Sequence, residues 1–261
     1  MRRTWGSVLF RIAVLLVVGA YFLVPLLSML DYSTQTPGSE PGRTWEAWQS
    51  LVTDDQLFAS IVTSLILSVV TVALMAALLL PTMIWVRLRV PRAERLVEFV
   101  CLLPLAVPAL VVVVGIRNVM LWVTYFLGDT PYALTFPYVI LVLPFCYRSL
   151  DSALSSIDTT TLAEAARSLG AGWGTVIGRI ILPNIVSGLL SAAFISIALV
   201  LGEYTFASLL HYDTLPVKIV EISQGQARTS VAASLASIAL VSILLLGLSF
   251  FSRDRRTAEG N

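Results

Sequence analysis

Charge is scarce in this chain of 261 residues: only 13% of the residues are charged, whereas 57% are hydrophobic. The mean hydropathy is +0.86. A soluble domain of this composition would expose apolar patches large enough to aggregate. The stretches between the apolar runs are too short to hold a soluble domain of any size. The composition therefore excludes a soluble fold and indicates an integral membrane protein.

Histidine and cysteine are almost as scarce as charge. His211 is the only histidine, and no evident metal ligands accompany it. Cys101 and Cys146 fall within apolar runs, where we expect small buried side chains rather than a disulfide or a metal pair. One histidine and scattered carboxylates do not supply the reactive cluster of a membrane enzyme. We therefore expect no catalytic site, no metal and no cofactor on this chain.

Long apolar runs are what the sequence has instead. Runs of about 20 residues can cross about 30 Å of hydrocarbon. Six predicted spans cover residues 8–30, 60–86, 97–127, 133–152, 185–210 and 230–251. Arg2 and Arg3 precede the first run, but no small-residue cleavage site follows it, so we expect a retained span. Pro104 and Pro108 are expected to bend the third span. The pattern predicts an all-α integral membrane protein with six transmembrane helices in one domain, residues 1–261.

Arginine and lysine are distributed unevenly between the loops. Cytoplasmic loops of membrane proteins carry an excess of these residues. With both termini in the cytoplasm, thirteen of the 17 Arg and Lys residues fall on that side, and Arg117 lies within a span. This bias predicts cytoplasmic N- and C-termini and a cytoplasmic segment 156–184. Loops 31–59 and 211–229, the latter with a short helix near 216–224, would serve as interfacial anchors or meet an extracytoplasmic partner.

The cytoplasmic segment contains TLAEAARSLGAGWGTVIGRIILPNI, a polar amphipathic stretch between two apolar runs. Thr161 and Glu164 have capping-box spacing, which predicts that a helix begins at Thr161. Gly170 is positioned to end this helix. The apolar stripe of the helix consists of Leu162, Ala165, Ala166 and Leu169. Such a stripe is suited to insertion into a groove of a partner.

A second amphipathic helix is predicted after the glycine-rich turn. Its apolar face consists of Trp173, Val176, Ile177, Ile180 and Ile181. Pro183 is expected to end or kink this helix before the fifth span begins. The turn GAGWG follows no predicted strand and precedes no Lys-Ser/Thr, so it is not a phosphate-binding loop. The two helices together predict a helix–turn–helix elbow on the cytoplasmic surface.

Two charged residues lie within predicted spans, Arg117 in the third and Glu203 in the fifth. A charge at a helix centre costs about 2.5–3.5 kcal/mol on insertion scales, so such groups face the bundle interior, a wet cavity or each other. We expect Arg117 and Glu203 to lie at similar depth and either to form a salt bridge or to line a pathway. Tyr204 would belong to the same wall or be an ordinary core aromatic residue.

The elbow also carries a familiar pattern: Glu164-Ala165-Ala166, three residues, Gly170, nine residues, Ile180, one residue, then Leu182-Pro183. This pattern resembles the EAA motif of ABC importer permeases, with every fixed position present. The segments LLPLAVPALVVVVGI, FPYVILVLPF and TLPVKIVE also look like parts of that family, so the resemblance covers nearly the whole chain from about Trp45. Within the family, the sequence looks most like the polyamine-type permeases.

The resemblance implies a type I ABC importer permease fold in the bacterial cytoplasmic (inner) membrane. It implies that two permease subunits, either copies or paralogues, form the pathway between them. Membrane lipid would surround the pair, and no nucleic acid is expected as a partner. An ABC ATPase dimer would bind ATP and Mg, and an extracytoplasmic solute-binding protein would deliver a polyamine or similar small solute. The elbow would be the coupling helix that seats in the ATPase. Its coupling residues would be Glu164, Ala165, Ala166, Leu169, Gly170, Ile180, Leu182 and Pro183. Glu164 would cap its own helix, contact the ATPase, or do both.

Two other classes of function are weighed against this interpretation. An ion-coupled secondary carrier usually shows internal repeats, which are not evident here, and has no use for a cytoplasmic docking elbow. A membrane enzyme lacks its reactive groups, so ATP hydrolysis is expected on a separate chain. Within the permease family, iron(III), thiamine and aminophosphonates remain alternatives to a polyamine.

Overall fold

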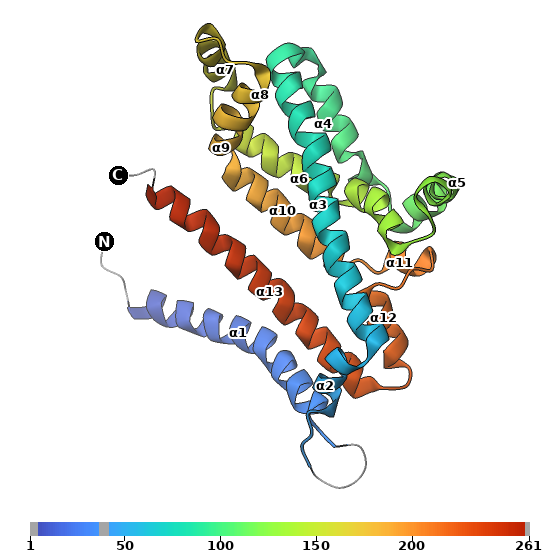
Figure 1. Cartoon of the computed structure of the whole chain (residues 1–261). Coiled ribbons are helices and arrows are strands. Elements are labelled where there is room, and N and C mark those ends of the chain that lie inside the picture. Colours follow the sequence, from blue (N-terminus) through green and yellow to red (C-terminus); the bar gives the residue numbers. More distant parts are fainter. Residues whose placement is uncertain (1–4, 37–41, 259–261) are drawn as a thin grey trace. The chain divides into compact units, whose positions relative to one another are not determined.

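Helices make up the regular structure of the described chain. The computed structural model describes residues 5–36 and 42–258, in which one isolated antiparallel bridge joins Gln35 to Arg43 (Figure 1). The long helices are α1 (Trp5–Ser33), α3 (Asp55–Arg89), α5 (Ala109–Leu127), α6 (Thr135–Ser155), α10 (Val186–Leu201) and α13 (Ala227–Ala258). The shorter ones are α2 (Glu46–Thr53), α4 (Glu94–Leu102), α7 (Thr159–Ser168), α8 (Trp173–Thr175), α9 (Leu182–Asn184), α11 (Thr205–Leu209) and α12 (Leu215–Ser223). Three 3-10 turns, η1 (Pro91–Ala93), η2 (Leu103–Ala106) and η3 (Pro131–Leu134), and a π-helix, η4 (Val176–Ile181), complete the set.

Among the described residues, five helical segments are long and apolar enough to cross a membrane. They are Leu9–Ser33, Asp55–Arg89, Ala109–Leu127, Pro131–Ser155 and Ala227–Gly247. A sixth candidate is the bent pair Trp173–Asn184 and Val186–Leu201, whose halves meet at 76°. The predicted all-α membrane fold is confirmed, and the six predicted spans agree with the upper count.

The third predicted span, 97–127, is not one continuous helix. α4 ends at Leu102, η2 follows, and Val107 is extended, with φ −112° and ψ 123°. A residue before proline is driven out of the helical region, and proline itself donates no helical hydrogen bond. Pro108 therefore separates α4 from α5, so the apolar run is broken where only a bend was predicted.

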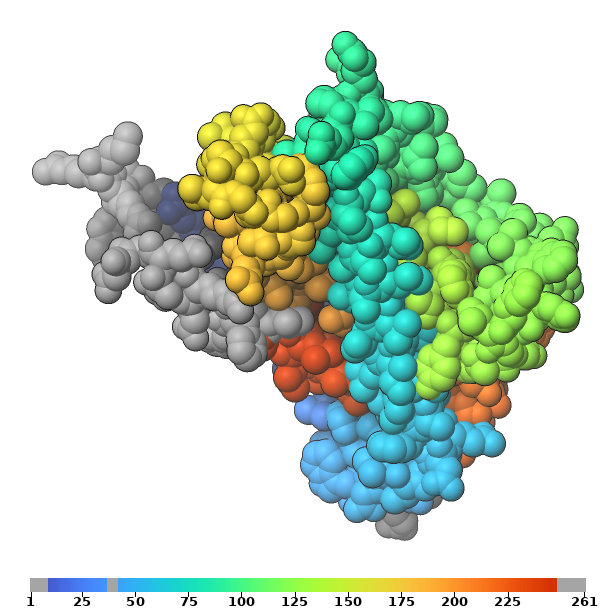
Figure 2. Space-filling view, turned by 45° about the horizontal axis from the view of Figure 1, so that its top comes forward, coloured from blue at the N-terminus to red at the C-terminus, as the bar shows by residue number. Residues whose placement is uncertain are grey.

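The chain forms two compact units, described here one at a time. Unit 2 comprises Ala59–Val217 and Leu240–Asn261 and holds a large apolar core around α6. α10 packs so closely against α6 that a Cβ at Gly188 would collide with the Cβ of Ala153. The Ser149 hydroxyl donates to the Gly188 carbonyl at 3.0 Å across the same contact. Figure 2 shows the segment after α6 standing out at the surface of this unit, in yellow.

An ion pair fixes the end of α6 to the end of α3. The Arg87 guanidinium lies 2.7 Å from the Asp151 carboxylate and 2.7 Å from the Ser155 hydroxyl. Glu94 at the start of α4 lies 3.8 Å from the same arginine. The Arg87 side chain is only 15% exposed, so these contacts form a partly buried tie between α3, α4 and α6 just before the chain leaves α6.

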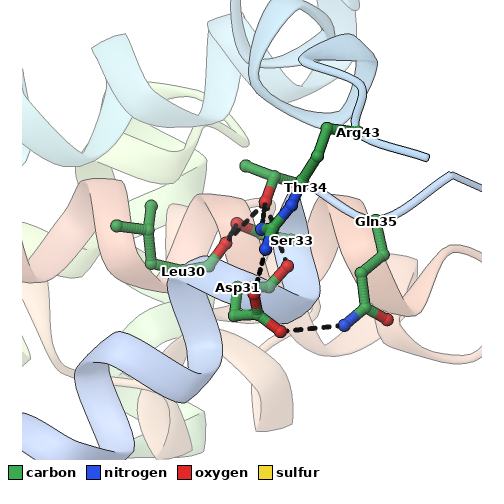
Figure 3. Close-up of polar contacts among 6 residues, drawn as sticks. All are labelled: Leu30, Asp31, Ser33, Thr34, Gln35 and Arg43. Atoms are coloured by element: carbon green, nitrogen blue, oxygen red, sulfur yellow. Dashed lines mark hydrogen bonds and ion pairs between the residues drawn. The ribbon is translucent and has the colours of Figure 1, made fainter. Parts of the chain in front are cut away.

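Unit 1 comprises Met1–Phe58 and Lys218–Ala239. Side-chain hydrogen bonds join the end of α1 to Arg43, which precedes α2 (Figure 3). Arg43 donates to Asp31 at 2.6 Å and to the Thr34 hydroxyl at 2.8 Å, and Gln35 donates to the other Asp31 oxygen at 2.9 Å. Trp48 of α2 donates its indole N–H to Ser33 at 3.1 Å. These bonds attach α2 to the end of α1.

Lys218 of α12 is a buried cation in the same unit, 8% exposed. Its ammonium donates to Gln56 at 2.8 Å and to Glu221 at 2.9 Å. A buried charge needs such partners to offset its lost hydration. The short helix predicted near 216–224 is confirmed as α12, but the role of Lys218 in attaching it to the start of α3 was not anticipated.

Candidate functional site

The first arm of the elbow is α7, and Asp158 caps its N-terminus. The Asp158 carboxylate accepts the Thr161 backbone N–H at 3.0 Å and the Thr161 hydroxyl at 2.7 Å. These hydrogen bonds hold the pKa of Asp158 below its usual value. The prediction that the helix begins at Thr161 with Glu164 in a capping box is wrong, because Asp158 starts the helix earlier. Glu164 is left exposed and free of a capping role.

Gly170 ends α7, as predicted. Its φ is +86°, the left-handed region in which a side chain is strained. The Gly170 N–H bonds to the Arg167 carbonyl at 2.9 Å, and the Ala171 N–H bonds to the Ala166 carbonyl at 3.0 Å. This pair of bonds is a Schellman motif, which satisfies carbonyls that the helix end leaves free. The turn between the two arms is therefore fixed by backbone geometry.

The predicted apolar stripe of α7 is divided between two faces. Ala166 is buried with Ala163 and packs into the core of unit 2. Ala165 is exposed, and Leu169 is 89% exposed. The helix is rotated from the predicted orientation because its small residues, Ala163 and Ala166, allow close approach to the core. Its outer face, with Glu164, Ala165 and Leu169, remains uncovered in this chain.

The second arm packs against the core through the predicted face. Val176 and Ile181 are fully buried. The half-buried residues of this face are Trp173, Ile177 and Ile180, which also contact the core cluster. The arm is not one regular α-helix, since residues 176–181 form the π-helix η4 between α8 and α9.

Pro183 lies near the end of the second arm, and Leu182 beside it is half-buried. Proline lacks the N–H that would bond to a carbonyl of the preceding turn. Asn184 instead donates its side-chain amide to the Ile180 carbonyl at 2.7 Å. The 76° bend follows at once, so the predicted kink after Pro183 is confirmed.

Glu203 is not inside a helix, because α10 ends at Leu201 and the predicted span 185–210 is interrupted there. Glu203 is 9% exposed, and its carboxylate accepts the Phe206 N–H with both oxygens, at 3.1 and 3.0 Å. It thereby caps α11. The hydroxyl of Tyr138 on α6 is buried and has no hydrogen-bond partner within the described chain. Tyr204 beside it is 41% exposed.

Arg117 and Glu203 do not form the salt bridge considered from the sequence. Arg117 is exposed on α5, and neither residue takes part in an ion pair within the described ranges. The hydrogen-bond partner of Glu203 is instead local, the backbone N–H of Phe206 three residues away. Arg117 instead lines an open groove of about 650 Å³ on unit 2.

Loop residues complete that groove. Tyr212 donates its hydroxyl to Asp129 at 2.8 Å, and His211 lies beside them with φ +62°. Burial of the Tyr212 hydroxyl, together with its hydrogen bond to the Asp129 carboxylate, raises the pKa of Tyr212 to about 12. Sequence reasoning missed the Asp129–Tyr212 contact, since the two residues are 83 positions apart. The groove thus presents both charge signs next to an apolar wall of α5.

Most of the chain is similar in sequence to known membrane components of transport systems. The sequence model described as binding-protein-dependent transport system inner membrane component matches residues 72–257. The spermidine/putrescine transport system permease protein PotC of Haemophilus influenzae is 26% identical over 251 residues, which cover 92% of this chain and 94% of that protein. The molybdenum transport system permease protein ModB of Escherichia coli (strain K12) is 33% identical over 129 residues, 46% of this chain and 56% of ModB. The family match contains the whole elbow and both helices that flank it.

Proposed function

Because this chain belongs to the family of binding-protein-dependent transport system inner membrane components, the permeases of ABC importers, we propose that it forms half of an ATP-driven import pathway. The family is one of transport system components, so we place ATP hydrolysis on a separate chain. A second permease subunit, a copy or a paralogue, would form the other half. ATP and Mg would bind to a separate ATPase dimer in the cytoplasm. Both termini of this chain would also lie on the cytoplasmic side.

The two-faced elbow is the observation that carries this proposal. Its inner face is buried in the core through Ala166 and Ile181, whereas Leu169 on the outside is 89% exposed. An apolar side chain outside the bilayer is favourable when a partner covers it. We assign Glu164, Ala165 and Leu169 to contact with the ATPase groove. The remaining coupling residues, Ala166, Gly170, Ile180, Leu182 and Pro183, shape the elbow and attach it to the core.

The attachment explains how the elbow would transmit motion. Its second arm leads through the bend at Ile185 into α10, and α10 packs against α6 at Gly188. Close-packed interiors transmit displacement rather than absorbing it. Closure of the ATPase dimer would therefore move α10 and α6 with the elbow, as a rigid-body route to alternating access.

The cargo is proposed as a polyamine or a similar small solute. This choice is supported by PotC of Haemophilus influenzae, which is similar to nearly the whole chain and is named for spermidine and putrescine. An extracytoplasmic solute-binding protein would deliver the solute to loops 31–59 and 211–229. Arg117, Tyr204 and the groove of α5 are the proposed pathway side chains of this chain.

The coupling proposal is tested by Ala165→Trp, which adds bulk to the exposed face of α7 without touching the core. We expect normal membrane insertion, loss of the ATPase subunit on co-purification, and loss of uptake. Val90→Trp, at an exposed position outside the elbow, is the matched control and should behave as the unmodified chain. Full ATPase retention and uptake in Ala165→Trp would contradict the proposal.

The cargo proposal needs its own measurement. Vesicles that contain the assembled transporter and its solute-binding protein should accumulate labelled spermidine when ATP is supplied. Iron(III), thiamine and aminophosphonate serve as alternative solutes in the same assay. Uptake of one of these, without spermidine uptake, would replace the polyamine but leave the coupling proposal standing.

A further inference from the structure

A tryptophan–arginine cluster joins the end of α3 to both arms of the elbow. It consists of Trp85 and Arg89 of α3, Arg167 of α7 and Trp173 of α8. The guanidinium carbons of Arg89 and Arg167 lie 4.9 and 4.8 Å from the centre of the Trp173 ring. The rings of Trp85 and Trp173 are 6.5 Å apart at 62°. Two cations therefore share one aromatic ring within unit 2.

Among the residues that the structure describes, no carboxylate forms an ion pair with either of these two cations. Arg87 and Arg148 in the same unit each face a carboxylate, at 2.7 and 3.3 Å. Within the described ranges, neither Arg89 nor Arg167 has an ion pair, and both are exposed. Both guanidinium carbons lie within 4.9 Å of one ring centre, so an anion beside that ring is attracted by both cations. The cluster is thus a concentrated positive charge with free guanidinium donors.

An apolar groove of about 380 Å³ begins at the same two tryptophans. Pro81, Thr82, Leu88 and Ile177 line it together with Trp85 and Trp173. Trp85 is 56% exposed, and α3 is one of the helices long and apolar enough to cross a membrane. Tryptophan is enriched where membrane helices meet the headgroup region. The groove therefore follows the side of α3 and includes Trp85 and Trp173, the two rings that Arg89 contacts.

We propose that this surface binds an anionic phospholipid, with its phosphate on Arg89 and Arg167 and an acyl chain along the groove. Basic pockets between membrane helices at the cytoplasmic side suit anionic headgroups. Charge complementarity selects the anion, and the apolar groove selects a lipid over a free phosphate. Because Arg89 belongs to α3 and Arg167 to the elbow, the bound lipid would connect the two elements and hold the elbow in place against α3. This site goes beyond the proposed transport function and requires only that the chain lies in a membrane.

Lipid retention by the purified full chain tests the proposal. The chain is exchanged into phosphatidylcholine containing a minor share of phosphatidylglycerol, and bound lipid is measured by native mass spectrometry. The unmodified chain should retain phosphatidylglycerol selectively, and the double variant Arg89→Gln/Arg167→Gln should lose that selectivity by roughly tenfold. The control Arg92→Gln/Arg179→Gln removes two exposed arginines outside the cluster and should retain it.

Several outcomes would overturn the proposal. Equal loss in the control variant would mean that general surface charge, not this site, holds the lipid. Displacement of the lipid by inorganic phosphate at a comparable concentration would mean a free-anion site. If the double variant kept its lipid but no longer co-purified with the ATPase subunit in the assembled transporter, the cluster would belong to the partner interface instead.

A second measurement avoids variants that fail to fold. Bromine atoms on acyl chains quench nearby tryptophan fluorescence, so phosphatidylglycerol with brominated chains should quench the unmodified chain more than brominated phosphatidylcholine does. The excess quenching should disappear in Trp85→Phe/Trp173→Phe, because these two tryptophans line the groove. Equal quenching by both lipids in the unmodified chain would refute the site even if every variant unfolded.

Discussion

α1 and α6 are both apolar enough to span a membrane, yet the chain treats them in opposite ways. None of the most apolar window of α1 is buried within the chain, whereas 61% of the corresponding window of α6 is buried. α6 is the less apolar of the two and includes Tyr138, Pro144, Cys146 and Tyr147 in its buried set. In lipid, an apolar side chain gains little by leaving the hydrocarbon, so helices associate through small residues and polar contacts. Hydropathy therefore finds the spans of this chain but not its core.

The largest effect should come from the glycine against which α6 packs. Gly188→Leu places a branched side chain where a single Cβ already collides with Ala153. Overpacking costs about 1–3 kcal/mol and occasionally more, and leucine adds three carbons beyond the colliding Cβ, so we expect a loss of about 3 kcal/mol or more. Gly19→Leu in α1 is the matched control, because nothing lies within 4 Å of its Cβ position. Thermal unfolding in detergent should show a lower melting temperature only for Gly188→Leu.

The same pair of variants has a local readout. Cys146 is fully buried, and its Sγ lies 3.0 Å from the Ser196 hydroxyl between α6 and α10. Labelling with a maleimide should be slow in the unmodified chain and in Gly19→Leu, and faster in Gly188→Leu. If both glycine variants melted and labelled alike, the contrast between the two helices would be wrong.

The two ion pairs at the ends of these helices should differ next. Asp151→Asn breaks the partly buried pair with Arg87 and should cost about 1.5–3 kcal/mol, the range for hydrogen bonds to charged groups. Asp31→Asn breaks the pair with Arg43 at the end of α1, where the two side chains are 50% and 64% exposed. Exposed pairs contribute little and are screened by salt. Melting temperatures at low and high salt should separate the two variants, with Asp31→Asn near the unmodified chain.

The smallest effect concerns the cap where the chain passes from α6 into the elbow. The hydrogen bonds of Thr161 lower the pKa of Asp158, so the charged form is favoured in the folded state. Protection of the first turn of α7 from hydrogen exchange should be complete above the ordinary Asp pKa near 3.8 and decline as the pH falls through the lowered value. Asp158→Asn should keep a cap but lose this pH dependence, whereas an unchanged profile in that variant would assign the titration elsewhere.

The sequence was most informative where a conformation depends on neighbouring residues alone. Gly170 could be identified as a helix end because its position after an amphipathic stripe requires a left-handed residue. Both Asp158 and Thr161 are suitable N-caps, and the pattern with Glu164 favoured the wrong one. Thr159 and Ala163 are buried in the helix that Asp158 begins, and this burial is not visible in the sequence.

The remaining errors have a common physical origin. A hydropathy average over 97–127 does not register that Pro108 forces Val107 out of the helix. The tryptophan–arginine cluster joins Arg89 to Trp173 across elements that no local pattern relates. Side-chain contacts between distant segments depend on helix rotation, and a single sequence constrains that rotation weakly.

The cap that Glu203 provides has a consequence for how this chain is made. A membrane protein is inserted segment by segment as it leaves the ribosome, and a lone carboxylate would need to wait for a partner helix. Here the partner N–H belongs to Phe206, three residues further along the same segment. This contact is local, so it can form together with α11, whatever the order in which the other helices assemble. Glu203 therefore has a hydrogen-bond donor during biosynthesis that does not depend on a distant element of the chain.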